Sequence, residues 1–178
     1  SNMLYLPKRA VFIHIPRAAG NSITSAIATA CAGRGIDLIT GTSGFIPNWR
    51  HTARHIRAGV LRDDIEEWDN IYKFAIHRPQ EDRARSALRL IERDIENNIH
   101  EQDSCPQQWK DVLTGKTRSQ YWETFMEHTT DWYTKGDNGE NLGVEIWDYK
   151  NLNESWPIIC ERCHIPKCSL EHLNIGPR

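Results

Sequence analysis

Residues 12–23 have the sequence Phe12-Ile13-His14-Ile15-Pro16-Arg17-Ala18-Ala19-Gly20-Asn21-Ser22-Ile23. The apolar run at its start is rich in β-branched residues and stops at a proline, which predicts a buried strand. Apolar residues then recur at helical spacing as far as about residue 32. The small residues between predict a tight loop, whose backbone N–H groups and helix N-terminus can bind a phosphate or sulfate. A purely structural loop, packed closely on the sheet, is the alternative.

Length and composition indicate one globular domain, residues 1–178, because 178 residues with 39% hydrophobic side chains can bury a sizeable core. The formal net charge of -2 argues against general nucleic-acid binding. No apolar run reaches the ~18 residues of a membrane span and no signal-peptide pattern is present, so we expect a soluble, cytoplasmic protein. Ser1 and Asn2 precede Met3 as a cloning remnant would, which leaves a removed targeting segment open.

The rest of the chain predicts an α/β fold with a central, mainly parallel sheet flanked by helices. Residues 1–9 are expected to be a short leader, and residues 36–39 a short strand. A central strand is predicted at 71–76, a further strand at 142–147, and a helix at 151–163 that is interrupted or started near Pro157. Ligands of such sheets collect at the carboxyl ends of the strands.

A helix is predicted directly after Pro79, with its apolar face formed by Ala84, Leu88, Ile91 and Ile95. Ser86 falls on the other side of that helix. We expect the arginines at 83, 85, 89 and 93 to solvate an exposed face. Arg78 is the exception, because a strand end beside a proline is a poor place for an incidental surface arginine.

Three cysteines, Cys160, Cys163 and Cys168, lie close together in sequence with two histidines nearby. A structural zinc site usually has two paired sets of ligands, and this spacing provides only one. We therefore predict no metal. The alternative for these cysteines is packing as small hydrophobic residues.

Two motifs, each after a predicted strand, resemble those of the sulfotransferases that use 3′-phosphoadenosine 5′-phosphosulfate (PAPS), in the branch of carbohydrate sulfotransferases and their bacterial relatives. Residues 14–22 resemble the family's 5′-phosphosulfate loop, usually written HIPKTAGTS. Residues 74–79, with Arg83 and Ser86, resemble its 3′-phosphate motif. Residues 51–57 and 172–174 also resemble segments of that family, so the resemblance spans nearly the whole chain and implies a single P-loop-like domain.

The resemblance implies transfer of a sulfuryl group from PAPS to a hydroxyl acceptor, a glycan or a small molecule, without a metal. Arg17 would stabilise the developing charge and His51 would take the proton of the acceptor, since imidazole titrates near neutrality. His14 faces the same region, although its place in the strand also fits a structural histidine. The residues implied to bind the nucleotide are Arg17, Ala18, Ala19, Gly20, Asn21, Ser22, Arg78 and Ser86.

Two positions depart from the family pattern: Arg17 replaces the usual lysine, and Asn21 the usual threonine. Arginine keeps the charge but is not equivalent, because lysine is a compact point charge. Nucleotide binding is expected to survive, while the transfer rate is in question. The alternatives are a non-catalytic homologue that binds nucleotide and a P-loop-like phosphoryl transferase. The absence of G-x-x-x-x-G-K-[ST] from the sequence argues against the phosphoryl transferase.

Overall fold

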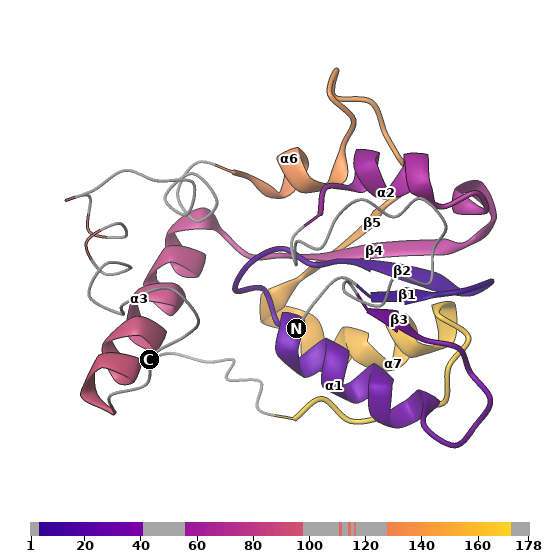
Figure 1. Ribbon diagram of the computed structural model, residues 1–178, viewed down its shortest axis with the longest axis horizontal. Coiled ribbons are helices and arrows are strands. Elements are labelled where there is room, and N and C mark those ends of the chain that lie inside the picture. The colour runs from indigo at the N-terminus through magenta and orange to yellow at the C-terminus, as the bar shows by residue number, and fades with distance from the viewer. Residues whose placement is uncertain are drawn as a thin grey trace. The chain divides into compact units, whose positions relative to one another are not determined.

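The computed structural model describes residues 4–40, 56–97, 111, 114, 116 and 128–171 (Figure 1). The chain divides into two compact units. The sheet unit comprises residues 1–77 and 130–178, and the α3 unit comprises residues 78–129. Each unit is described by itself, and the single domain expected for residues 1–178 stays a prediction.

The sheet unit holds five described strands and four described α-helices. Its elements in chain order are β1 (Leu4–Leu6), β2 (Ala10–Ile13), α1 (Gly20–Cys31), β3 (Ile39–Thr40), α2 (Ala58–Asp64), the 3-10 helix η1 (Trp68–Asn70), β4 (Tyr72–His77), α6 (Thr130–Thr134), β5 (Glu145–Asp148), the 3-10 helix η3 (Tyr149–Asn151) and α7 (Leu152–Arg162). In the described part of the chain, no helix is both long and apolar enough to cross a membrane.

The strands form one mixed sheet in the order β3-β1-β2-β4-β5. β2, β4 and β5 are parallel, whereas β1 pairs antiparallel with both β2 and β3. The α/β prediction is therefore confirmed. The predicted mainly parallel sheet is a mixed one, in which β1 runs against the other four described strands and makes both antiparallel pairings.

The prediction of a leader at residues 1–9 is wrong for residues 4–9, the part of it that the structure describes. Residues 4–6 form β1, and a tight turn connects it to β2. In that turn Arg9 donates its backbone N–H to the carbonyl of Leu6 at 2.9 Å, and Lys8 has a positive φ of 66°. Leu4 pairs with Phe12. Because all three β1 residues are buried, this segment belongs to the core.

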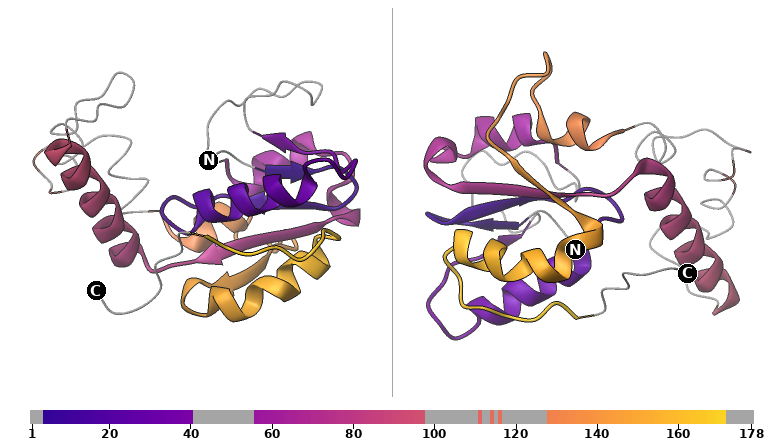
Figure 2. Two further views of the ribbon diagram at one scale, coloured as in Figure 1. Left: turned by 90° about the horizontal axis from the view of Figure 1, so that it is seen from below. Right: turned by 180° about the vertical axis from the view of Figure 1, so that it is seen from behind.

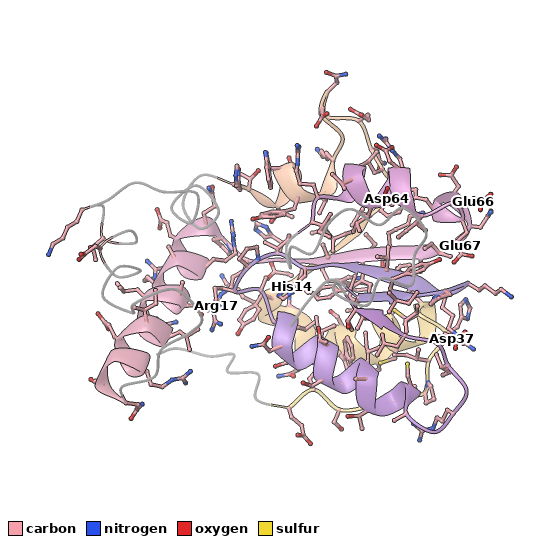
Figure 3. All side chains as sticks on the ribbon, viewed as in Figure 1. His14, Arg17, Asp37, Asp64, Glu66 and Glu67 are labelled. Atoms are coloured by element: carbon pink, nitrogen blue, oxygen red, sulfur yellow. The ribbon has the colours of Figure 1, made fainter. Side chains whose placement is uncertain are left out.

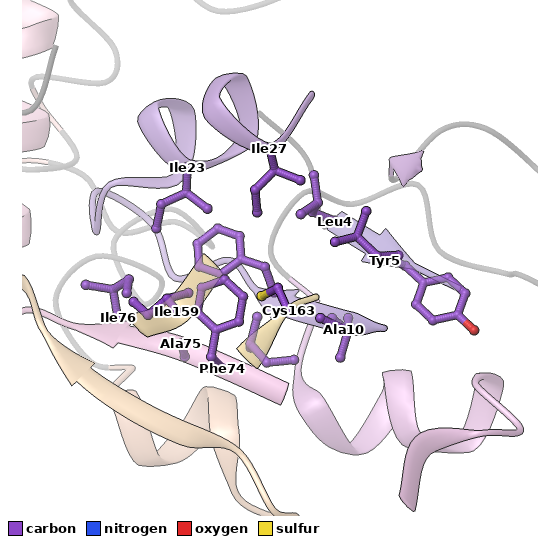
Figure 4. Close-up of a cluster of buried hydrophobic side chains, with 14 of the residues drawn as sticks. Leu4, Tyr5, Ala10, Ile23, Ile27, Phe74, Ala75, Ile76, Ile159 and Cys163 are labelled. Carbon is purple, nitrogen blue, oxygen red and sulfur yellow. The ribbon is translucent and has the colours of Figure 1, made fainter. Parts of the chain in front are cut away.

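The helices cover both faces of the sheet: α1 and α7 lie on one face, and α2 and α6 lie on the other (Figures 1 and 2). In the core, the rings of Phe12 and Phe74 from neighbouring strands stack with centroids 5.0 Å apart. Figure 4 shows side chains of both covering helices around Phe74, including Ile23 of α1 and Ile159 of α7. These side chains are completely buried, so the packing fixes α1 and α7 on the sheet.

Two helix predictions can be compared directly with the structure. The helix expected to end near residue 32 is α1, and its predicted apolar positions Ile23, Ala26, Ile27 and Ala30 are all buried. The helix near the C-terminus does not begin at Pro157. It begins at Leu152 and continues through Pro157, which costs it one helical hydrogen bond.

The α3 unit contains the helix α3 (Gln80–Glu96), which begins directly after Pro79 as predicted. Its buried face differs from the prediction: Arg83 is 0% exposed and Ser86 is 7% exposed. The expectation that Arg83 solvates an exposed face is therefore wrong. Its guanidinium donates a hydrogen bond to the backbone carbonyl of His128, a partner 45 residues away that helical periodicity does not indicate.

Candidate functional site

The connection between β2 and α1 contains two residues in a rarely occupied backbone conformation. Arg17 has φ 60° and Ala19 has φ 66°, whereas the intervening Ala18 does not have a positive φ. For a residue with a Cβ, the left-handed region costs roughly 1–2 kcal/mol. Ala18 is completely buried, and its backbone N–H donates to the carbonyl of Ile15 at 3.3 Å. Two such residues in one short connection, with a completely buried alanine between them, indicate that the surrounding structure holds this backbone in place.

The loop leads directly into the N-terminus of α1. The first helical hydrogen bond runs from the N–H of Ile23 to the carbonyl of Ala19 at 3.0 Å. The N–H groups of Gly20, Asn21 and Ser22 precede that bond and lie at the positive end of the helix dipole. The first turn of α1 contains no acidic side chain. This end of the helix is therefore suited to a negatively charged group.

His14 determines how closely the helix approaches the strand. The imidazole is only 5% exposed and stacks on Phe12 with ring centroids 5.6 Å apart. A Cβ added to Gly20 would lie 1.6 Å from Nε2 of His14, which no pair of atoms can tolerate. Only glycine therefore fits at the first position of α1 while His14 keeps this orientation. The structure thus gives His14 a packing role beneath the loop.

Three carboxylates of the sheet unit lie away from the loop. Figure 3 shows His14 and Arg17 at one end of the unit, Glu66 and Glu67 at the opposite end, and Asp64 between them. The carboxylate of Glu67 is also engaged locally, since it accepts hydrogen bonds from the hydroxyl of Tyr5 and from the backbone N–H of Lys8. The carboxylates at 64, 66 and 67 thus do not oppose an anion at the loop.

His77 lies at the carboxyl end of β4 and was not among the site residues predicted from the sequence. His77 places Nδ1 2.6 Å from the hydroxyl of Thr130, the first residue of α6. The buried hydroxyl of Thr134 in turn donates to the carbonyl of Thr130 at 2.9 Å. Because β2 and β4 are parallel, His77 lies at the same edge of the sheet as the loop after β2.

The predicted 3′-phosphate residues lie in the α3 unit. Arg78 is half-buried just before α3, and Ser86 is buried about two turns into that helix. Arg83, three residues before Ser86, shares its buried face. Nearby, Asp82 forms an ion pair with Arg85. That pairing offsets the negative charge of Asp82 in the first turn of α3.

Some predicted residues cannot be placed. His51 and residues 172–174 lie outside the described residues. Of the segment 51–57, the structure describes Ile56 and Arg57. Arg57 donates from Nε to the carbonyl of Trp132 at 2.9 Å and lies 4.2 Å from the centroid of its ring. It also forms an ion pair with Asp137 at 3.1 Å. Arg57 therefore connects the start of α2 to the segment around α6 through these contacts.

Among the described residues, no group of three histidine, cysteine, aspartate or glutamate side chains is arranged to hold a metal ion. Comparison of the chain with models of protein families, with curated proteins and with solved structures finds no match. The likeness to sulfotransferases therefore rests on the sequence segments named above alone.

Proposed function

We propose that this protein is a PAPS-dependent sulfotransferase that acts on a hydroxyl acceptor of the carbohydrate class. The observation that carries the proposal is the loop after β2. Two residues with side chains, Arg17 and Ala19, adopt positive φ there and lead into a helix N-terminus without acidic residues. Such strain persists only where the surrounding structure enforces it, and it is concentrated at functional sites.

The groups present at the loop fit a sulfate or phosphate. The guanidinium of Arg17 offers a planar fork of donors, and the N–H groups of Gly20, Asn21 and Ser22 lie beside the loop. In this proposal the bound nucleotide supplies an activated sulfuryl group. Sulfuryl transfer resembles phosphoryl transfer, in which positioning and charge stabilisation provide most of the catalysis. Arg17 would hold the negative charge that develops at the sulfate and the departing phosphate.

The 3′-phosphate is assigned to Arg78 and Ser86, on the likeness of their motif. The half-burial of Arg78 and the burial of Ser86 support the assignment, because hydrogen bonds to a phosphate are stronger where water is partly excluded. The general base is assigned to His51 by the same likeness. A protein that binds the nucleotide without transfer is the alternative, and the arginine at position 17 is its motivation.

The first test is a thermal shift with 3′-phosphoadenosine 5′-phosphate, compared with ADP and with ATP plus Mg²⁺. A ligand that binds only the folded state at a hundredfold excess over Kd stabilises it by about 2.7 kcal/mol. We expect a clear shift with the 3′-phosphorylated nucleotide alone. A shift only with ATP and Mg²⁺ would favour the phosphoryl transferase, and no shift with any nucleotide would contradict both.

Variants then separate the two motifs. Arg17→Ala should weaken binding by about 10- to 150-fold, because it removes charge-assisted hydrogen bonds worth about 1.5–3 kcal/mol. Arg34→Ala is the matched control, since Arg34 is exposed beyond the other end of α1 and binds the carbonyl of Ala30. Arg78→Ala should abolish the preference for the 3′-phosphorylated nucleotide over ADP. Equal binding by Arg17→Ala and the parent would refute the role of the loop.

Transfer itself is measured with PAPS and a panel of sugar and small-molecule alcohols. Arg17→Lys restores the family's residue and should raise the transfer rate while leaving nucleotide affinity within a few-fold. His51→Ala should abolish transfer but not binding. Tight binding without transfer to any acceptor, in both the parent and Arg17→Lys, would favour the non-catalytic alternative.

A further inference from the structure

Four cysteines of the sheet unit gather near the C-terminal end of α1 and around α7. Cys160 and Cys163 lie on or directly after α7, Cys31 ends α1, and Cys168 follows in the segment beyond α7. None of the four is in a disulfide. Burial, and after it the neighbouring thiols of Cys160, Cys168 and Cys31, raise the pKa of Cys163. The four thiols are therefore close enough to influence one another electrostatically.

Within this group, one pair is in direct contact: Sγ of Cys160 lies 3.9 Å from Sγ of Cys168. The chain brings the pair together by reversing after α7. His164 adopts φ 55° and donates its N–H to the carbonyl of Glu161 at 3.1 Å, and Ile165 donates to the carbonyl of Cys160 at 3.2 Å. These are the two hydrogen bonds of a Schellman motif, which ends a helix and turns the chain back along it.

The returning segment is also fixed at Cys168 itself. The indole N–H of Trp156, on α7, donates to the backbone carbonyl of Cys168 at 2.8 Å. Two features therefore hold the two thiols in contact: the Schellman motif at the end of α7, and the hydrogen bond from Trp156 to Cys168. Closing the gap from 3.9 Å to the S–S bond length of about 2.05 Å requires a movement of under 2 Å.

We propose that Cys160 and Cys168 form a reversible disulfide that locks the segment after α7 onto that helix, with a low-molecular-weight disulfide such as oxidised glutathione as the oxidant. The sulfur of Cys168 attacks glutathione disulfide, forms a mixed disulfide and releases one glutathione thiolate. The sulfur of Cys160 then attacks the sulfur of Cys168 and releases the second glutathione. Two protein thiols are oxidised, one glutathione disulfide is reduced, and the two protons go to the two glutathione thiolates.

Exposure decides the order of these steps. Cys168 is partly exposed, whereas Cys160 is completely buried and cannot meet an oxidant first. Burial also raises the pKa of Cys160 to about 12, so it reacts slowly as a nucleophile unless its partner is already in contact. We therefore expect a glutathione adduct on Cys168 to precede the disulfide. Cys163 is as completely buried as Cys160 but is not part of the proposed pair, so the variant Cys163→Ala serves as a control.

Trypsin distinguishes all the candidate pairings, because each of the five cysteines falls in its own tryptic peptide. These are residues 18–34, 94–110, 151–162, 163–167 and 168–178. The full-length protein is incubated with oxidised and reduced glutathione, quenched by acid and alkylation, digested without reduction and analysed by mass spectrometry. We expect peptide 151–162 linked to peptide 168–178, and loss of that link on addition of dithiothreitol.

The stability of the intact protein gives an independent readout. Oxidation should raise the Tm of the parent and of Cys163→Ala, and should leave the Tm of Cys168→Ser unchanged. A link from 168–178 to 163–167 or to 18–34 would overturn the assignment of the pair. A persistent glutathione adduct on Cys168 without any link, or no reaction in the folded protein, would overturn the proposal itself, and the peptide map of the parent decides this even if a variant fails to fold.

Discussion

Substitution of Gly20 by alanine is the sharpest test of the loop geometry. The added Cβ would lie 1.6 Å from Nε2 of His14, whereas atoms of this kind essentially never approach within 3.0 Å. The imidazole, only 5% exposed, would have to move by at least about 1.4 Å within a packed core. Overpacking of this kind costs about 1–3 kcal/mol, and alanine recovers less than about 1 kcal/mol through its better helix propensity. We expect Gly20→Ala to lower the free energy of unfolding by about 1–2 kcal/mol.

The cause is isolated by a double-mutant cycle with His14→Ala, which removes the clashing ring. In that background Gly20→Ala should change the free energy of unfolding by no more than about 0.5 kcal/mol, which gives a coupling energy of about 0.5–2.5 kcal/mol. Gly59→Ala is the matched control, because its Cβ would meet only Leu142, at an ordinary 4.0 Å. It should be neutral or stabilising.

Stability is measured by urea denaturation, followed by both tryptophan fluorescence and circular dichroism to check that the two transitions coincide. Equal destabilisation by Gly20→Ala with and without the His14 ring would refute the reasoning. Nucleotide binding by Gly20→Ala, measured in parallel, shows whether the displaced loop still holds its ligand.

Three further predictions concern buried or strained residues elsewhere. Arg83→Met should lower the free energy of unfolding by about 1–3 kcal/mol, because it removes a buried charged donor. Arg85→Met is the control and should change that free energy by less than about 0.5 kcal/mol, since the Arg85 side chain is 61% exposed. Similar urea midpoints for the two variants would contradict the burial of Arg83. Burial lowers the pKa of Lys73 from its ordinary 10.5, so the unfolded chain binds more protons than the folded one as pH approaches that value. The stability of the parent relative to Lys73→Met should therefore rise with pH up to 10.5 in a series of urea titrations, and a flat or falling difference would contradict it. His164→Gly should raise the free energy of unfolding by about 0.5–1 kcal/mol, since glycine adopts φ 55° without steric cost, and a lower urea midpoint would argue against that backbone conformation.

Local patterns in the sequence were sufficient to predict β2, the loop after it and α1. β2, the loop and α1 follow one another within residues 10–31, where apolar spacing and small residues act over a few positions. The same holds for the start of α3 after Pro79. In these segments the features that select the structure lie next to one another in the chain, so periodicity alone predicts them.

The features that the sequence left undetermined depend on partners far along the chain. β1 is only three residues long, too short for a periodic pattern, and it is a strand because its backbone pairs with β2 and β3. Arg83 resembles the exposed arginines around it until the carbonyl of His128 is placed against it.

The candidate site likewise combines features set by neighbouring residues with features set by distant parts of the chain. The sequence by itself predicted a tight loop between a strand and a helix within residues 12–32, and the structure confirms the loop between β2 and α1. Only the tertiary structure decided that His14 lies against Gly20, that His77 meets Thr130, and that Cys160 touches Cys168. Those contacts arise from strand register, from α1 and α6 packing on the sheet, and from the chain reversal after α7. A local pattern carries no information on which distant segment its side chains will meet.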